Sequence, residues 1–194
     1  DNKGFHESIN RAIPEVKKDK IAVFGVKPEK PHQGYGYIKC SKIENEDELM
    51  KVSDFFEKPN LKKAEKYSKS KDFFWNSGIF LFKNSNFIDY IKLCEPEIYE
   101  LTEKAMNNLT KDKKFILPSK KEFSECSSIS IDHALMEKTK EYKIPVIMSI
   151  LSGGWSDIGS WDSLYKSSLK DKNNNNIKGD VLSLNTKNSL LHIG

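Results

Sequence analysis

The chain has 194 residues, of which 37% are hydrophobic and 11% aromatic, so an intrinsically disordered protein is excluded. No run approaches 18 apolar residues, so we expect no transmembrane helix and no membrane partner. The 32 basic residues against 28 acidic ones give a net charge of +4, and Arg11 is the one arginine among them. Since nucleic-acid recognition depends on bidentate arginine contacts, we also expect no nucleic-acid partner.

Hydrophobic periodicity predicts an alternation of helices and strands along the chain. In chain order the first half predicts a helix over 4–17, strands over 21–26 and 35–43, a turn at 44–47, a strand over 52–56, a helix over 61–68, and strands over 73–75 and 79–82 around a polar break at 76–78. The second half predicts helices over 87–93 and 98–109, a helix from 131 capped by Ser130, a strand over 144–151 with Pro145 at its beginning or on an edge, a Ser160-capped helix over 161–168, a linker at 173–176, and strands over 181–184 and 190–193. This order favours an α/β fold with most strands in one sheet.

The three cysteines, Cys40, Cys94 and Cys126, are far apart and form no CxxC pair. A zinc ribbon or a redox motif is therefore not expected. Free thiols in a chain that opens without a basic-then-apolar leader indicate a cytoplasmic protein.

Glycines stand beside aromatic residues in several short segments, where a ligand can approach the backbone closely. All three tryptophans fall in two of them. The segments are Gly34-Tyr35-Gly36-Tyr37-Ile38, Phe56-Glu57-Lys58-Pro59, Trp75-Asn76-Ser77-Gly78-Ile79-Phe80 and Gly154-Trp155-Ser156-Asp157-Ile158-Gly159-Ser160-Trp161. Two further segments accompany them, Gly25-Val26-Lys27-Pro28 and Ser130-Ile131-Asp132-His133-Ala134-Leu135-Met136-Glu137.

In order and spacing, these six segments resemble the sugar-1-phosphate nucleotidyltransferases, and most closely the mannose-1-phosphate guanylyltransferases, over most of residues 1–170. The resemblance implies a Rossmann-like α/β nucleotidyltransferase domain with a mixed central sheet flanked by helices. It also implies that the phosphate of mannose 1-phosphate attacks the α-phosphorus of GTP, with Mg²⁺ as cofactor. GDP-mannose forms and pyrophosphate leaves.

The resemblance assigns a role to each segment. Gly34, Tyr35 and Gly36 belong to the substrate-binding segment, whose glycines let backbone groups reach the sugar. Glu57 accepts hydrogen bonds from two vicinal hydroxyls, and Asn76 offers a hydroxyl both a donor and an acceptor. The catalytic residues are Lys58, on the sugar phosphate, and Asp157, as the Mg²⁺ ligand.

Each assignment has a simpler alternative. Glu57 and Lys58 could form a solvated strand end, and Asn76 and Asp157 could cap turns or a helix. Asp132 sits near a helix start, where a carboxylate favours the helix dipole without any ligand. His133 stands where the family often has another aromatic residue, which suggests packing.

The family's glycine-rich loop followed by Arg and Lys is not found in this sequence, and Asp1 is not assigned as a second metal ligand. We therefore expect residues 1–172 to be the C-terminal, sugar-binding part of the catalytic domain, inactive alone and associated as a homodimer. Residues 173–194 would begin a strand-rich linker, which precedes a mannose-6-phosphate isomerase domain in many members. Two other functions stay open: a non-catalytic sugar-phosphate-binding module, or a nucleotidyltransferase for another base or hexose.

Overall fold

The computed structural model describes residues 2–43, 46–112 and 114–193, without the side chains of residues 46 and 47. Packing divides the chain into two compact units, residues 1–153 and 154–194. The predicted domain boundary after residue 172 marks where the family resemblance ends, whereas this division reflects packing. That boundary stays a prediction. Each unit is described by itself.

The first unit combines a sheet with helices in the alternating order that the sequence predicts. Its elements are α1 (Asn2–Lys17), β1 (Ile21–Val26), β2 (Tyr37–Ile43), β3 (Glu46–Phe56), α2 (Leu61–Ser68), β4 (Phe73–Leu81), α3 (Asn84–Cys94), α4 (Pro96–Asn107), β5 (Thr110–Asp112), β6 (Phe115–Leu117), α5 (Lys120–Glu125), α6 (Ile131–Ala134), a 3₁₀ turn (Met136–Lys138) and β7 (Val146–Ile150).

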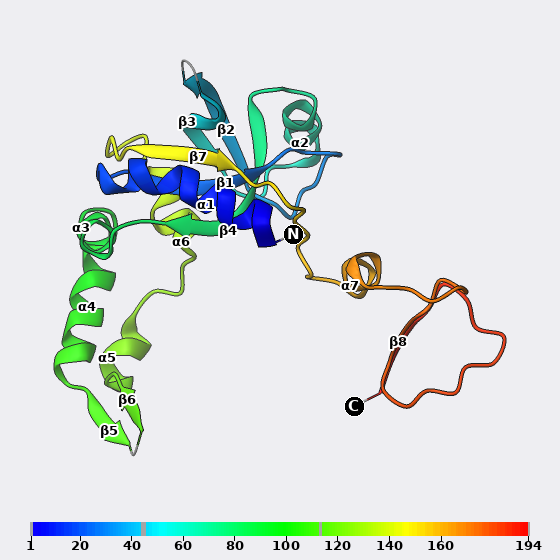
Figure 1. Ribbon diagram of the computed structural model, residues 1–194. Coiled ribbons are helices and arrows are strands. Elements are labelled where there is room, and N and C mark those ends of the chain that lie inside the picture. Colours follow the sequence, from blue (N-terminus) through cyan, green and yellow to red (C-terminus); the bar gives the residue numbers. More distant parts are fainter. Residues whose placement is uncertain (1, 44–45, 113, 194) are drawn as a thin grey trace. The chain divides into compact units, whose positions relative to one another are not determined.

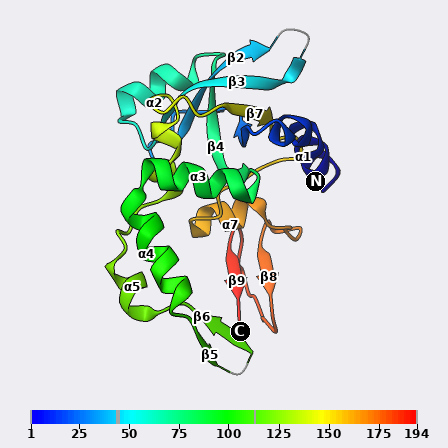
Figure 2. The ribbon, with the colours of Figure 1, turned by 90° about the vertical axis from the view of Figure 1, so that its left-hand side faces the viewer.

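Five strands form a closed ring in the order β1-β4-β2-β3-β7. β1 and β7 run parallel, with Ile21 opposite Val146, whereas the other neighbours are antiparallel. Figures 1 and 2 show helix α1 against these strands and α3 beyond β4. The expected α/β class, with a mixed sheet flanked by helices, is confirmed.

Strand β1 is buried on both faces, as its continuous apolar run predicts. Ile21 and Val23 belong to the core shared with α3 and α6, whereas Ala22 and Phe24 pack against α1 on the other face. All four are at most 1% exposed. The strand therefore fixes two helical layers to one sheet.

Strand β4 runs without a break from Phe73 to Leu81, so the predicted interruption at 76–78 is wrong. The polar residues form an irregularity instead: the register with β1 shifts between the pairs Val23–Phe80 and Gly25–Asn76. Gly78 has a φ of 75°, which suits glycine in the irregularity. The strand therefore stays paired with β1 on both sides of the irregularity.

Several other boundaries differ from the sequence-based expectations. Residues 44 and 45 of the predicted turn lie outside the described residues, while strand β3 already begins at Glu46. The hairpin β5–β6 and helix α5 were not expected, because their segments are short and mostly exposed. Ser130 stands at the N-cap of α6 without a side-chain cap hydrogen bond. Pro145 precedes β7, and its carbonyl accepts from Ile21 N at 3.0 Å.

The second unit contains helix α7 (Trp161–Ser167) and two short parallel strands, β8 (Asn176–Lys178) and β9 (Leu190–His192). Ser160 caps α7 as expected, since its hydroxyl accepts from Ser163 N at 3.1 Å. The strand expected over 181–184 is absent from this described segment. β8 instead begins at the end of the asparagine run that predicted a linker.

Asn175, which is 1% exposed, connects the start of β8 with the segment that precedes β9. Its Nδ2 donates to Thr186 O at 2.9 Å, and its Oδ1 accepts from Ser189 N at 3.1 Å. Asn175→Ala leaves two partly buried backbone groups without this partner, which should destabilise the unit locally by about 1–3 kcal/mol. The amides of Asn176 and Ile193 should then exchange with solvent about 5- to 150-fold faster. Exposed Asn173→Ala is the matched control, and equal acceleration in both variants would contradict this role.

Within the part of the chain that the structure describes, every helix is too short or too polar to cross a membrane.

Candidate functional site

Strands β2 and β4 bring two of the predicted site residues together at the start of β2. Asn76 N donates to Gly36 O at 2.8 Å. A β-carbon placed on Gly36 would lie 2.6 Å from Glu57 Oε2 and 3.3 Å from Asn76 Cβ. Only glycine therefore leaves room for the Glu57 and Asn76 side chains beside this backbone.

Glu57 and Lys58 follow the end of β3 and form an ion pair, with 2.9 Å between Lys58 Nζ and Glu57 Oε1. The Glu57 side chain is 8% exposed, whereas that of Lys58 is 64% exposed. The carboxylate is thus fixed against the protein while the ammonium group stays open to a ligand. The hydrogen bond to Glu57 raises the pKa of Lys58, which keeps the ammonium charged.

Lys58 also has an unusual backbone, with a φ of 43°. Left-handed conformations are strained for a lysine, and the following proline adds its own restriction on this residue. Such strain persists where surrounding contacts hold it, commonly at functional sites.

The side chain of Asp132, on α6, contacts Asn76. Asn76 Nδ2 donates to Asp132 Oδ1 at 3.0 Å, and Asn76 Oδ1 accepts from Gly78 N at 3.2 Å. Burial and, next, the negative charge of Glu57 raise the pKa of Asp132. The helix dipole of a four-residue helix is thus not its main interaction.

Glu137 forms hydrogen bonds both with the segment that follows β3 and with α6. Glu57 N donates to Glu137 Oε1 at 3.1 Å, and Glu137 Oε2 lies 2.8 Å from His133 Nδ1. The His133 side chain is 50% exposed. It therefore makes a polar surface pair, in place of the packing that the sequence suggested.

The hydrogen bond with Glu137 raises the pKa of His133 above its usual 6.5. Glu137→Gln should bring the pKa of His133 back down, as measured by NMR titration of the imidazole. Stabilisation by this pair should be complete below about pH 6.5, the unfolded pKa, and disappear as the pH rises through the folded value. Glu103→Gln, which removes a similarly exposed carboxylate on α4, is the control and should leave His133 unchanged.

Gly34 and Tyr35 precede Gly36 in the chain, and the Tyr35 ring packs with the rings of His32 and Trp75. The Tyr35 ring stacks on His32 at 3.7 Å and meets Trp75 edge-on at 5.2 Å. Gly34 N donates to His32 Nδ1 at 3.2 Å. Trp75 Nε1 is buried without a hydrogen-bond partner in the described part of the chain. The predicted segment thus borders Trp75 and Asn76.

Asp157 belongs to the second unit, where its side chain lies near Gly159. An exposed carboxylate is a suitable oxygen donor for Mg²⁺, which takes few protein ligands and keeps several waters. No group of three His, Cys, Asp or Glu side chains suited to a metal occurs among the described residues. The metal role of Asp157 stays a prediction.

The structure adds Asp132 and Glu137 to the residues that the sequence assigned. Both lie in the segment 130–137, which carried the resemblance but received no ligand-binding role. The four-residue spacing of His133 and Glu137 is a helical signal for a pair. The contact of Asp132 with Asn76 spans 56 positions, and no local pattern could reveal it.

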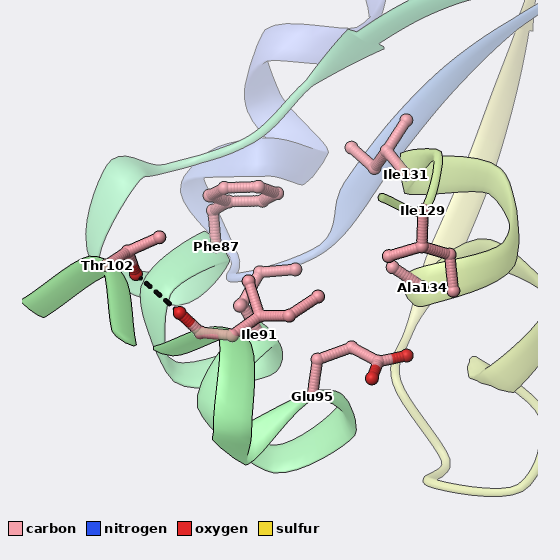
Figure 3. A pocket seen from close by; sticks show the side chains of 8 residues that line it. Phe87, Ile91, Glu95, Thr102, Ile129, Ile131 and Ala134 are labelled. Atoms are coloured by element: carbon pink, nitrogen blue, oxygen red, sulfur yellow. Dashed lines mark hydrogen bonds between the residues drawn. The ribbon is translucent and has the colours of Figure 1, made fainter. Parts of the chain in front are cut away.

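A hollow lies between α3, α4 and α6, with a volume of about 280 Å³. Figure 3 shows Phe87, Ile91 and Ile131 around it. Its charged residue, Glu95, is paired with Lys138 at 2.6 Å, and Thr102 donates to Ile98 O. This lining suits apolar packing rather than a phosphorylated sugar.

The chain is similar to a known protein family and to several named proteins. A family model described as nucleotidyl transferase matches residues 2–174. A mannose-1-phosphate guanylyltransferase of Salmonella montevideo is 40% identical over 197 residues, covering 99% of this chain and 41% of that protein. The chain spans about two fifths of the length of the curated relatives it matches.

Two solved structures are also similar. A mannose-6-phosphate isomerase from Helicobacter pylori is 33% identical, with a TM-score of 0.69, over 80% of this chain and 59% of that one. A protein from Thermus thermophilus, described as a mannose-1-phosphate geranyltransferase, has a TM-score of 0.74 over 93% of this chain and 49% of that one. At 23% identity, the second likeness concerns the fold alone.

Proposed function

This chain belongs to the nucleotidyltransferase family, and from that premise we propose that the protein transfers a guanylyl group from GTP to mannose 1-phosphate. The family and the fold expected from the six segments are both confirmed. The specific substrates come from the named relatives, which are longer than this chain. We assign the sugar-phosphate side of the reaction to the residues described above.

The observation that carries this proposal is the convergence of Glu57, Lys58 and Asn76 beside Gly36. A carboxylate with two oxygens in one plane can accept from two vicinal hydroxyls. The buried Glu57 is held by its backbone and by Lys58, so it is preorganised for such contacts. An exposed, charged lysine beside it suits the phosphate of the same molecule.

The chemistry is mainly positioning and charge neutralisation. An oxygen of the mannose phosphate forms a bond to the α-phosphorus of GTP while the bond to the β-phosphate oxygen breaks. Pyrophosphate carries away the electron pair, and GDP-mannose remains. Lys58 would neutralise charge on the attacking phosphate, and Asp157 would hold Mg²⁺. When bound, that ion would neutralise charge on the nucleotide phosphates.

The test is an assay of the complete protein that contains this chain, with a panel of nucleoside triphosphates and hexose 1-phosphates. We expect the highest kcat/KM for GTP with mannose 1-phosphate, measured as pyrophosphate release. A clear preference for UTP with glucose 1-phosphate would overturn the guanylyl assignment. Binding of a hexose 1-phosphate without turnover of any nucleotide would favour the sugar-phosphate-binding module instead.

The same assay on the 194-residue chain should show no turnover, because the glycine-rich phosphate loop is not found in its sequence. Sedimentation would test the predicted homodimer. The cytoplasmic location, and an isomerase activity of the kind named for the Helicobacter pylori structure, stay predictions that this assay does not address.

A further inference from the structure

The amide of Asn76 is held at both of its ends. Its Nδ2 donates to the Asp132 carboxylate at 3.0 Å, and its Oδ1 accepts from Gly78 N at 3.2 Å. Turning the amide over would place an oxygen against the carboxylate and an NH₂ group against the amide N–H. Both contacts would then be repulsive, so one orientation of the 9%-exposed side chain is strongly preferred.

We infer that Asp132 is a positioning residue, which fixes the Asn76 amide so that it presents an N–H donor to a sugar hydroxyl opposite the Glu57 carboxylate. This inference rests on the proposed function. The ligand class is a hexose 1-phosphate, and neither the family description nor the named relatives assign Asp132 a role.

The hydrogen-bonding capacity that remains on Asn76 supports this role. An amide nitrogen carries two hydrogens, and the described contacts use one of them, toward Asp132. Both side chains lie close to the Gly36 backbone, since a β-carbon on that residue would be 2.6 Å from Glu57 Oε2 and 3.3 Å from Asn76 Cβ. A sugar hydroxyl bound between the two side chains could donate to the carboxylate and accept from the amide at once. This pairing distinguishes a hydroxyl from a hydrogen or a carbonyl.

The charges around Asp132 fit a residue that acts through Asn76. Glu57 is the negative group that acts on Asp132, and His133 and Lys58 are the positive groups that act on it. Burial and, next, the negative charge of Glu57 raise the pKa of Asp132, so a carboxylate is unfavourable at this position. A purely structural contact could be made by a neutral side chain without this disadvantage.

The experiment compares Asp132→Asn, Asp132→Leu and the exchange variant Asn76→Asp/Asp132→Asn in the complete protein. Calorimetry measures affinity for mannose, glucose and galactose 1-phosphates, and thermal unfolding measures stability. Asp132→Asn keeps an acceptor for Asn76 and should retain affinity within a few-fold. Asp132→Leu should weaken binding by about 10- to 100-fold and raise KM for the sugar phosphate but not for GTP.

The exchange variant separates positioning from structure. It restores the hydrogen bond with reversed polarity, so stability should return to near that of the unmodified protein. The side chain at position 76 then has no N–H donor, so binding should stay at least tenfold weaker. Recovery of both stability and affinity would overturn the inference. Asp54→Asn, which removes a carboxylate paired with Lys140 at 2.6 Å, is the control and should bind normally.

If the proposed function is wrong, the experiment gives a different result than if the role of Asp132 alone is wrong. If the unmodified protein binds glucose or galactose 1-phosphate in place of mannose 1-phosphate, the substrate proposal is wrong and the role of Asp132 is tested on the sugar that binds. Equal affinity of all variants for that sugar would overturn the inference alone. Absence of binding to every hexose 1-phosphate would overturn both.

Discussion

Replacing Glu57 by Gln or Lys58 by Met in the complete protein should lower kcat/KM for the sugar phosphate by roughly 30- to 1000-fold. This corresponds to about 2–4 kcal/mol of lost transition-state binding for one charge-assisted contact. The Glu57 carboxylate is nearly buried, so water cannot replace its contacts easily. Lys58→Met additionally removes the ion pair that holds Glu57 Oε1.

Steady-state kinetics with varied sugar phosphate and fixed nucleotide measures this effect. Lys140→Met is the matched control, because Lys140 is 70% exposed and makes a comparable ion pair with Asp54. It should leave kcat/KM unchanged. If both site variants fold and retain the efficiency of the unmodified protein, Glu57 and Lys58 are not the sugar-phosphate ligands.

Gly36→Ala should lower the affinity for the sugar phosphate by roughly 10- to 100-fold, since overpacking by one methyl group costs about 1–3 kcal/mol. The new β-carbon would lie 2.6 Å from Glu57 Oε2 and 3.2 Å from Phe55 Cζ. Phe55 is 7% exposed and has little room to move, so the Glu57 carboxylate must shift. Calorimetry with mannose 1-phosphate and a thermal unfolding curve of the same sample measure binding and stability together.

Gly4→Ala is the matched control. Its β-carbon would lie 2.7 Å from Ser152 O, a similarly close approach on helix α1. This variant should unfold at a lower temperature while the folded protein binds normally. Equal losses of affinity in the two glycine variants would show that general destabilisation, rather than displacement of Glu57, weakens binding.

Regular elements with a clear apolar pattern were predicted well from the sequence. The helix over 61–68 has the predicted bounds because it buries one apolar face. The strand over 21–26 has them because its continuous apolar run is buried and is followed by a lysine and a proline. The hairpin β5–β6 could not be predicted in this way. Its strands have three residues each and all of them are exposed, so no burial pattern marks them.

The polar break at 76–78 illustrates a different limit. Asn76, Ser77 and Gly78 are typical turn residues, so a local interpretation ends the strand there. In the folded protein β4 pairs with both β1 and β2, and this pairing holds the strand through the irregularity. Tertiary hydrogen bonds thus override the local preference.

The sequence alone determined the family resemblance, the α/β class and the candidate residues Gly36, Glu57, Lys58 and Asn76. Residue type and chain order were sufficient for this, because each short segment contains a recognisable set of residue types at a fixed spacing. Only the tertiary structure decided that Asp132 and Glu137 join these residues, since both contacts cross more than fifty positions of the chain. It also decided the orientation of the Asn76 amide, because an amide acquires a fixed direction only when a donor and an acceptor from elsewhere in the fold meet its two ends.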